Sequence, residues 1–411
     1  MHRTPSLASC ITLVLTVVAA ASAGQPASFQ GLGDLPGGDF ASYPRGLTAD
    51  GSIVIGGSDD SAGLQAFRWT QAEGIDCLRN LSGACVDFNA GRISADGSVV
   101  IGSIPLGGLG LRWTPAGGVE FLNPGVSSGP SDASADGSVI VGSARFNGQS
   151  GHAFRWTQPE GMVDLGILGG FTSTAHGVSA DGSVVVGVSE SAPILNAEAF
   201  RWTEAEGMVG LGGLFEGSTQ STAEAISADG LVIVGGSESP LGFEAFRWTQ
   251  EGGMVGLGYL PGGFVVSRAT AVSADGSVIV GVSVTEPQFN EAFIWDSVAG
   301  MRNLREVLIE QGVTNVVDWT LRKATAISAD GQTIVGSGTN PNGDLEGWIA
   351  TLPQSNACPA DLTGDGDVNA ADLAQLLGAW GPNPGHPADF NGDDVVNAAD
   401  LAQLLGAWGP C

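Results

Sequence analysis

Short runs of apolar and β-branched residues recur along most of the chain, with clusters of Gly, Pro, Asn and Ser between them. The repeating unit is clearest from Thr222 onward, where four runs read TAEAIS, LVIVGGS, EAFRWT and GMVGLG. Runs of this length, bounded by turn residues, predict short β-strands. Each unit of about 45 residues therefore predicts four strands.

An Ala-Asp-Gly turn follows the first run of each unit and recurs seven times, at spacings of 40 to 55 residues. Its aspartates are Asp50, Asp96, Asp136, Asp181, Asp229, Asp275 and Asp330. Because Asp-Gly between two β-prone runs favours a two-residue hairpin turn, we expect these residues to form turns. The alternative is a set of metal-binding or catalytic carboxylates.

Seven units of four strands predict an all-β, seven-bladed β-propeller. The ends of the array agree with this fold, because the last unit stops after its third run, Glu346–Ile349, and Gly31–Gly38 resembles the missing fourth. We therefore expect an N-terminal strand to close the last blade, which leaves no open sheet edge. An open β-solenoid is the alternative.

A Trp stands in the third run of every unit: Trp69, Trp113, Trp156, Trp202, Trp248, Trp295 and Trp348. We expect these rings to pack between neighbouring blades; a row of ligand-stacking platforms is the alternative. An Arg precedes five of them, and Ile294 and Gly347 replace it in the last two units. This Arg predicts a polar staple to a turn carboxylate or a carbonyl, with an anion-binding ring as the alternative.

The sixth unit carries an insertion at residues 301–310, whose apolar residues at 301, 304, 307 and 308 predict one face of a short helix. An insertion on a regular ring is a candidate functional element, since binding residues concentrate on loops. A packing role is equally open.

The last 54 residues have a different pattern, with two near copies 28 residues apart that begin at Ala360 and Ala388. Each copy starts with oxygen-bearing residues at alternating positions. Apolar residues follow at the spacing of one helical stripe: Leu373, Leu376, Leu377 and Trp380, then Leu401, Leu404, Leu405 and Trp408. We expect two loop-helix units that bury these stripes against each other.

The loops have the spacing by which an EF-hand loop surrounds Ca²⁺ with oxygen ligands. The first offers Asp361, Thr363, Asp365, the carbonyl of Asp367, Asn369 and Asp372; the second offers Asp389, Asn391, Asp393, the carbonyl of Val395, Asn397 and Asp400. About two Ca²⁺ ions are expected, and Mg²⁺ fits less well because it prefers fewer protein ligands. A solvated acidic linker is the alternative.

The N-terminus reads as an export signal, with Arg3, an apolar run from Ile11 to Ala21 and a small-residue cleavage pattern ending at Ala23. The run is too short to span a bilayer, and no later stretch is long enough. We therefore predict a signal peptide at residues 1–23, a propeller at 24–353 and a calcium-binding module at 354–411.

Four cysteines remain after removal of the signal, and disulfides persist in exported proteins. The expected pairs are Cys77 with Cys85 and Cys358 with Cys411. The second pair brackets the tail module and would join the ends of a unit too small to have a large core.

Composition and charge favour some classes of partner over others. The chain has 43 acidic and 15 basic residues and a net charge of −28, but 43% of its residues are apolar, so it is not a disordered acidic polymer. Such a charge repels nucleic acids and anionic membranes and favours divalent cations. The tail concentrates this charge, with eight Asp and no Lys, Arg or Glu.

The units resemble the extracellular HAF-repeat family through His152-Ala153-Phe154 and through the SADG-SVIVG and GMVDLG-LGG segments. The resemblance covers roughly residues 28–352 and implies a secreted repeat domain, without implying an activity.

The tail resembles a type I dockerin from Asp361 to about Trp408, because each loop runs into a single helix and the unit is duplicated. The resemblance implies binding to a cohesin-like or cell-surface anchoring protein. It also implies that loop positions 10 and 11 help to select the partner; these are Ala370, Ala371, Ala398 and Ala399. The small residues and flanking cysteines are more similar to divergent Gly-Cys-type dockerins.

Common catalytic motifs such as HExxH, GxSxG, P-loop and CxxC are missing from the sequence, which predicts no catalytic residues. We therefore expect an exported, non-catalytic propeller with a calcium-stabilised anchor and a glycan or protein ligand. The rival is a tethered polysaccharide hydrolase or lyase, since carboxylate pairs can assemble across blades.

Overall fold

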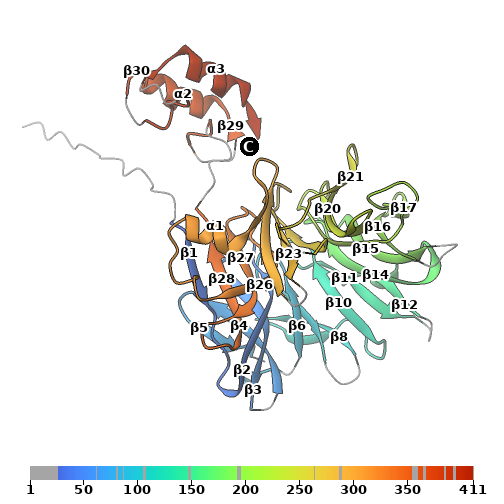
Figure 1. The fold of residues 1–411 in the computed structure, drawn as a ribbon. Coiled ribbons are helices and arrows are strands. Elements are labelled where there is room, and N and C mark those ends of the chain that lie inside the picture. The colour runs from blue at the N-terminus through green and yellow to red at the C-terminus, as the bar shows by residue number, and fades with distance from the viewer. Residues whose placement is uncertain are drawn as a thin grey trace, which may run out of the picture.

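The computed structural model describes residues 26–61, 63–79, 82–86, 88–104, 108–146, 150–191, 196–262, 264–286, 289–353, 360–363, 367–383, 386–391 and 395–410. The predicted signal peptide lies outside these ranges. Most of the described chain is β-strand, and three short helices are present among the described residues (Figure 1).

The second to sixth units each form one four-stranded antiparallel sheet whose strands follow chain order. These sheets are β6 (Asn89–Ile93), β7 (Val100–Ser103), β8 (Gly110–Thr114) and β9 (Gly118–Phe121); β10 (Ser128–Ala133), β11 (Val139–Arg145), β12 (Gly151–Thr157) and β13 (Gly161–Asp164); β14 (Gly169–Val178), β15 (Val184–Ser191), β16 (Asn196–Thr203) and β17 (Gly207–Gly210); β18 (Ser221–Ile226), β19 (Ile233–Ser239), β20 (Gly242–Thr249) and β21 (Gly253–Gly256); β22 (Ser267–Val272), β23 (Ile279–Glu286), β24 (Phe289–Asp296) and β25 (Gly300–Asn303). The four runs expected from Thr222 onward thus correspond to β18–β21.

The first and last units share one sheet of eight strands. The last unit supplies β26 (Thr320–Ile327), β27 (Thr333–Thr339) and β28 (Leu345–Thr351), and the first supplies β2 (Gly37–Leu47), β3 (Ile53–Asp60), β4 (Gly63–Thr70) and β5 (Gly74–Cys77). A single parallel pair, Ala41 with Leu345, connects β2 to β28.

The remaining strand, β1 (Ser28–Gly31), pairs antiparallel with β28 and so supplies the fourth strand of the last unit (Figure 1). It lies before most of the expected segment Gly31–Gly38 and overlaps it only at Gly31. The fifth unit shows the same order, since β21 ends directly before a Leu-Gly-x-Leu-Pro-Gly stretch. The resemblance of Gly31–Gly38 therefore concerns the loop after the fourth strand more than the strand itself.

The seven Asp-Gly segments form the turns between the first and second strands, as expected, but the two-residue hairpin prediction is wrong in length. In the first unit, Thr48 N–H donates to Ile53 O and Gly51 N–H to Thr48 O, which leaves a four-residue loop. The Thr48 hydroxyl accepts the N–H of Ile53 at 3.0 Å and donates to Asp50 Oδ1 at 2.7 Å. The side chains thus complete a turn whose Gly51 has a φ of 72°.

The same turns are joined by backbone hydrogen bonds from unit to unit. Ala135 N–H donates to Ala180 O, Ala180 to Ala228, Ala228 to Ala274, and Ala274 to Ala329. Ala329 N–H, in the last unit, donates to Ala49 O in the first, and the N–H groups of Ala49 and Asp96 donate to Ala95 O and Ala135 O. The first strands of neighbouring sheets also contact each other, including β26 with β2.

The cores lie between neighbouring sheets. A Phe in the third strand is fully buried in five units: Phe67, Phe154, Phe200, Phe246 and Phe293. Each packs over a glycine of the second strand, as Gly56 pairs with Phe67. The repeated Trp side chains join these clusters, and Trp156 Nε1–H reaches Leu122 O of the preceding unit at 3.0 Å. Packing between sheets is therefore their role.

Trp348 does not occupy the place expected for it. It pairs with Gly336, the counterpart of Gly56, so it fills the position that Phe67 has in the first unit. Ala350 and Ile349 take the places of the repeated Trp and Arg. The position of the glycine determines this register, because a glycine in the second strand leaves room for one large ring in the third strand.

The Arg before the repeated Trp acts as a staple in four units. Arg68, Arg155 and Arg201 pair with a glutamate five residues later, at 2.9, 3.5 and 2.9 Å, and Arg112 pairs with Glu120 at 2.7 Å. These pairs are exposed and contribute little to stability individually.

The expected insertion helix is α1 (Leu304–Glu310), and Asn303 caps it. Leu304, Val307 and Leu308 are buried in the core between the sixth and the last units. Met301 falls in β25 rather than in the helix. The insertion therefore packs against the sheet, which supports the packing role for its apolar face.

The tail contains α2 (Ala370–Gly378) and α3 (Ala398–Gly406), which contact each other (Figure 1). Four two-residue strands join the copies: β29 (Asp367–Val368) pairs with β32 (Gly409–Pro410), and β30 (Gly381–Pro382) with β31 (Val395–Val396). Each loop is thus paired with the segment that follows the other helix.

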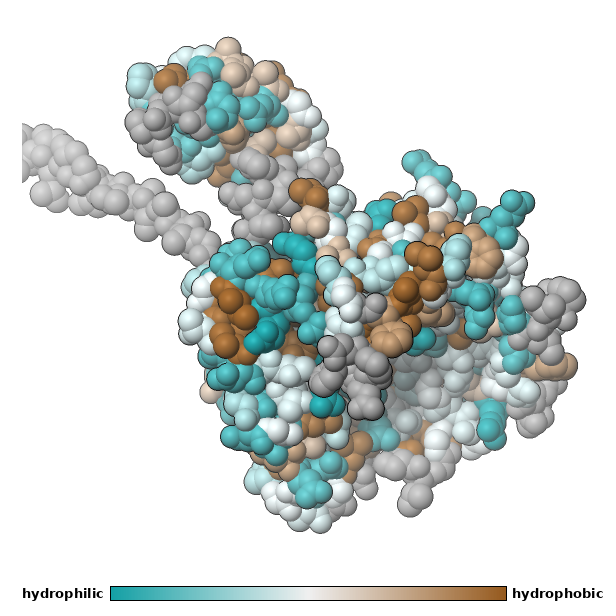
Figure 2. Space-filling view, in the orientation of Figure 1, coloured by the Kyte–Doolittle hydropathy of each residue, from teal (hydrophilic) through white to brown (hydrophobic). Residues whose placement is uncertain are grey.

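The prediction that whole apolar stripes are buried is wrong in part. Leu376 and Leu404 are fully buried, but Leu377 and Leu405 are each 52% exposed, and Trp380 and Trp408 are also exposed. The helices are only nine residues long, and each copy buries its loop residues Val368 and Val396 in place of the outer half of the stripe. Apolar and polar residues accordingly mix on the visible surface of the tail (Figure 2).

The disulfide between Cys77 and Cys85 is present, with Cα atoms 5.5 Å apart. Cys358 and Cys411 lie outside the described residues, so their pairing stays a prediction. Within the described ranges, no helix is long and apolar enough to cross a bilayer.

Candidate functional site

The first tail loop is organised around Asp372, at the twelfth loop position. This side chain is fully buried; Oδ1 accepts the N–H of Thr363 and Oδ2 the N–H of Asn369, both at 2.8 Å. The Thr363 hydroxyl donates to Asp361 Oδ1 at 3.2 Å. Four of the expected ligand residues, from the start and the end of the loop, are therefore brought together.

The second loop repeats this arrangement. Asp400 is also fully buried, and its Oδ1 accepts the N–H groups of Phe390 and Asn391 at 2.9 and 3.3 Å. Its Oδ2 accepts the N–H of Asn397 at 2.9 Å. Sequence reasoning did not foresee the contribution of Phe390, because a backbone N–H leaves no mark on residue type.

The two asparagines at the ninth positions begin the helices. The side-chain oxygens of Asn369 and Asn397 accept the N–H groups of Ala371 and Ala399, both at 2.8 Å, as N-caps. Each asparagine also completes a capping box, in which the carboxylate of Asp372 or Asp400 accepts the N–H of the N-cap residue. The ninth position of such loops often reaches the ion through water.

The structure does not describe every expected ligand. Asp365 and Asp393, the fifth positions, lie outside the described residues. Asp367 and Val395, expected to offer carbonyls, begin β29 and β31. Asp389 belongs to the described chain and makes the first position of the second loop.

The charge balance of the tail fits a cation. Burial opposes ionisation of Asp372, but the N–H groups of Asn369 and Thr363 outweigh it and lower the pKa of this carboxyl. The pKa of Asp400 is lowered in the same way, against the effect of burial, by Asn397, Phe390 and Asn391. Residues 354–411 contain no Lys or Arg that could neutralise these buried carboxylates. A divalent ion held by the loop oxygens would supply that charge.

The residues expected to select the partner lie at the starts of the two helices. Ala370, Ala371, Ala398 and Ala399 are all exposed. On the same helices, or just beyond them, are the exposed pairs Leu377 with Trp380 and Leu405 with Trp408. The tail therefore presents two copies of one surface.

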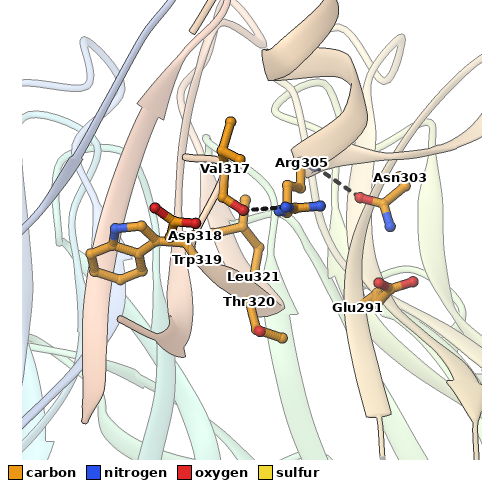
Figure 3. Close-up of a pocket in the computed structure, with 8 residues that line it drawn as sticks. All are labelled: Glu291, Asn303, Arg305, Val317, Asp318, Trp319, Thr320 and Leu321. Atoms are coloured by element: carbon orange, nitrogen blue, oxygen red, sulfur yellow. Dashed lines mark hydrogen bonds between the residues drawn. The ribbon is translucent and has the colours of Figure 1, made fainter. Parts of the chain in front are cut away.

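A separate cavity of about 280 Å³ lies beside α1 in the last two units (Figure 3). Arg305 donates a hydrogen bond to Val317 O, and its own N–H donates to Asn303 Oδ1 at 2.9 Å. Glu291, Asp318 and Trp319 also line it. The insertion thus borders a polar hollow, which the sequence indicated only as a candidate element.

Comparison with known families concerns the tail. Residues 359–406 match the model of the "Dockerin type I domain". The comparison with curated proteins finds no match.

Comparison with solved structures concerns the sheets. Oligogalacturonate lyase from Vibrio parahaemolyticus is similar with a TM-score of 0.52 and 10% identity, over 81% of this chain and 99% of that one. The Myceliophteria thermophila Cps50 (Swd1) β-propeller domain has a TM-score of 0.47 and 11% identity, over 79% and 99%. TolB from Acinetobacter baumannii has 0.42 and 14%, over 63% of this chain; the chain spans 62% of that structure.

At these identities the likeness concerns the fold alone, and it places the sheets among propeller-type folds. The family match and the loop geometry coincide over the same residues. Over residues 359–406, the tail of this chain is thus similar to a type I dockerin domain.

Proposed function

We propose that this chain is an exported, non-catalytic propeller that binds a ligand or builds surface structure and is attached through its calcium-dependent dockerin domain. The observation that carries the proposal is the pair of fully buried carboxylates, Asp372 and Asp400, in a tail without Lys or Arg. Bound Ca²⁺ would neutralise them and fix the loops at the starts of both helices. Attachment would then depend on calcium.

We infer that the sheets form a closed ring of seven blades. Five separate sheets and two halves of the eight-stranded sheet give seven sets of strands. The hydrogen bond from Ala329 to Ala49 and the pairing of β1 with β28 support closure between the last unit and the first. Closure of this kind leaves no edge strand open to aggregation.

The HAF-repeat resemblance and the N-terminal apolar segment support export to the cell surface or the medium. Dockerin domains bind cohesins, so the proposed partner is a cohesin-like or surface anchoring protein. Contact residues would come from Ala370, Ala371, Ala398 and Ala399 and from the exposed tryptophans beside them.

Calcium titration of the full chain tests the attachment module. We expect about two ions by calorimetry, and about one for the double variant Asp361→Ala with Asp372→Ala. The matched double variant Asp389→Ala with Asp400→Ala is expected to lose the other ion. A wild-type chain that binds no Ca²⁺ would overturn the proposal.

The absence of catalysis is tested with a panel of neutral and acidic polysaccharides. We expect binding without the appearance of new reducing ends or unsaturated products. Turnover that disappears when a propeller carboxylate such as Glu291 is replaced by Gln would instead support a tethered hydrolase or lyase.

A further inference from the structure

The first strands of the sheets carry an unusual concentration of ionisable residues. These strands, β2, β6, β10, β14, β18, β22 and β26, contact each other in turn and end at the linked Asp-Gly turns. Each has an ionisable residue four to seven positions before its turn aspartate. We call these seven residues the belt. At about 3.3 Å per residue, the belt lies roughly 13–23 Å along the strands from the turns.

Most of the belt is basic, although the chain as a whole is strongly acidic. Arg45, Arg92, Arg268 and Lys323 come from four different first strands, against Asp132 and Glu224 from two others. The chain has only 15 basic residues, and Lys323 is its single lysine. Four of the 15 therefore belong to this belt.

Contacts between strands hold part of this belt in position. The Arg92 guanidinium donates to Arg45 O at 2.9 Å and to Thr325 O at 3.2 Å, so it connects three first strands. Arg268 Nη1 lies 3.4 Å from Glu224 Oε1. His176 Nδ1 lies 2.8 Å from Ala223 O and 3.8 Å from Glu224 Oε2.

The cations face a common space. Burial lowers the pKa of Lys323, and Arg92, Arg268 and Arg45 lower it further while Glu224 opposes them. Lys323 nevertheless keeps solvent-exposed surface, and the Arg268 side chain is 48% exposed. Side chains that are surrounded by protein and still reach solvent are typical of a narrow water-filled passage.

The acidic residues of the belt neutralise only part of this positive charge. Asp132 is half-buried, and burial raises its pKa; its carboxylate accepts the N–H of Val178 at 3.0 Å. The Glu224 carboxylate lies within ion-pair distance of Arg268 and His176. The turn aspartates lie beyond a Debye length of about 8–10 Å and are largely screened. The belt therefore keeps an excess of positive charge around Lys323.

We propose that this belt is a binding site for a small oxyanion at the centre of the propeller, with Lys323 and Arg45 as its principal contacts. A carboxylated sugar and inorganic phosphate share the required chemistry, since both offer charged oxygens to ammonium and guanidinium donors. The ligand enters from the end away from the turn aspartates. The site gives the ligand class for the binding role proposed above and is independent of the calcium module.

Calorimetry on the full chain at low ionic strength tests the site, with glucuronate, inorganic phosphate and uncharged glucose as probes. We expect glucuronate or phosphate, but not glucose, to bind, and added salt to weaken the affinity. Binding of phosphate without glucuronate supports an inorganic oxyanion, and the reverse supports a carboxylated sugar. No binding of either anion, with the two calcium ions still bound by the tail, overturns the site and leaves the anchor intact.

Three variants make the test specific. Lys323→Gln removes an exposed cation from the belt and is expected to weaken anion binding at least tenfold. Arg145→Gln makes the same charge change on the exposed end of β11 and is expected to change affinity less than twofold. Glu224→Gln removes a competing anion and is expected to tighten binding about threefold or more, a gain that misfolding does not imitate. Equal effects of Lys323→Gln and Arg145→Gln contradict the proposal.

Discussion

The turn that joins the first two strands of each unit depends on two side chains. In the fourth unit, the Ser179 hydroxyl donates to Asp181 Oδ1 at 2.6 Å and accepts the N–H of Val184 at 3.0 Å. The hydrogen bonds from Ser179 and Ser183 lower the pKa of Asp181 from its ordinary value of 3.8. The carboxylate is therefore more stable in the folded chain than in the unfolded one.

Replacement of Ser179 by Ala is expected to destabilise the propeller by about 1–3 kcal/mol at pH 7, since two hydrogen bonds are lost. A lowered folded-state pKa stabilises the fold above the unfolded-state value and loses this effect as the pH falls through the folded-state value. The difference between wild type and Ser179→Ala should therefore shrink below pH 3.8. Urea unfolding followed by tryptophan fluorescence at pH 7 and pH 3 measures it.

Ser179→Thr is the control, because Thr48 already holds this place in the first unit. It should stay within about 0.5 kcal/mol of wild type. A loss in Ser179→Ala that is the same at both pH values would contradict the role of the Asp181 carboxylate.

At the scale of elements, β1 interacts with residues that lie far away along the chain. Phe29 is 5% exposed, and its ring lies 5.2 Å from that of Trp319 and 6.2 Å from that of Trp348. Asn315 Nδ2 donates to Phe29 O at 2.7 Å. The last unit therefore holds β1 in two ways: β28 pairs with it in the sheet, and Trp319 and Trp348 pack against its Phe29 side chain.

Phe29→Ala is expected to lower the free energy of unfolding by about 3–5 kcal/mol, because it leaves a cavity against two tryptophans. Phe40→Ala is the matched control, since Phe40 is 42% exposed, and should cost less than about 1 kcal/mol. Urea unfolding of both variants measures the difference. Similar losses for the two would mean that β1 does not pack on the last unit.

The strands and turns were predictable because their signals are local and repeated seven times. The register of Trp348 was not, since it depends on which second-strand residue is the glycine that faces it. The exposed half of the tail stripe was missed for a similar reason: Val368 and Val396 compete for the same core. The basic belt was also missed, because its members lie on separate strands without a shared motif.

At the scale of the whole molecule, charge divides the chain into two parts. The tail loops hold their carboxylates at the positions expected to bind Ca²⁺, whereas the Asp-Gly turns place theirs against hydroxyl and N–H groups. The first arrangement needs a cation for neutrality, and the second does not. Stability of the two parts should therefore respond differently to chelators.

Calorimetric unfolding of the full chain is expected to show two transitions in excess Ca²⁺. A ligand present at 100 times its dissociation constant stabilises the form that binds it by about 2.7 kcal/mol. Addition of EDTA should therefore abolish or lower the tail transition and leave the propeller midpoint within about 1–2 °C. One common transition that moves with EDTA would show that the propeller and the tail unfold together.

The pairing of β28 on both edges has a mechanical consequence for a protein held by its tail. Tension on the tail enters the propeller at Leu352, directly after β28. This strand forms seven residue pairs with β27 and four with β1. A pull cannot peel it away as a free edge strand, because rows of hydrogen bonds on two sides must rupture together. The N-terminal strand thus acts as a clamp on the strand that bears the load.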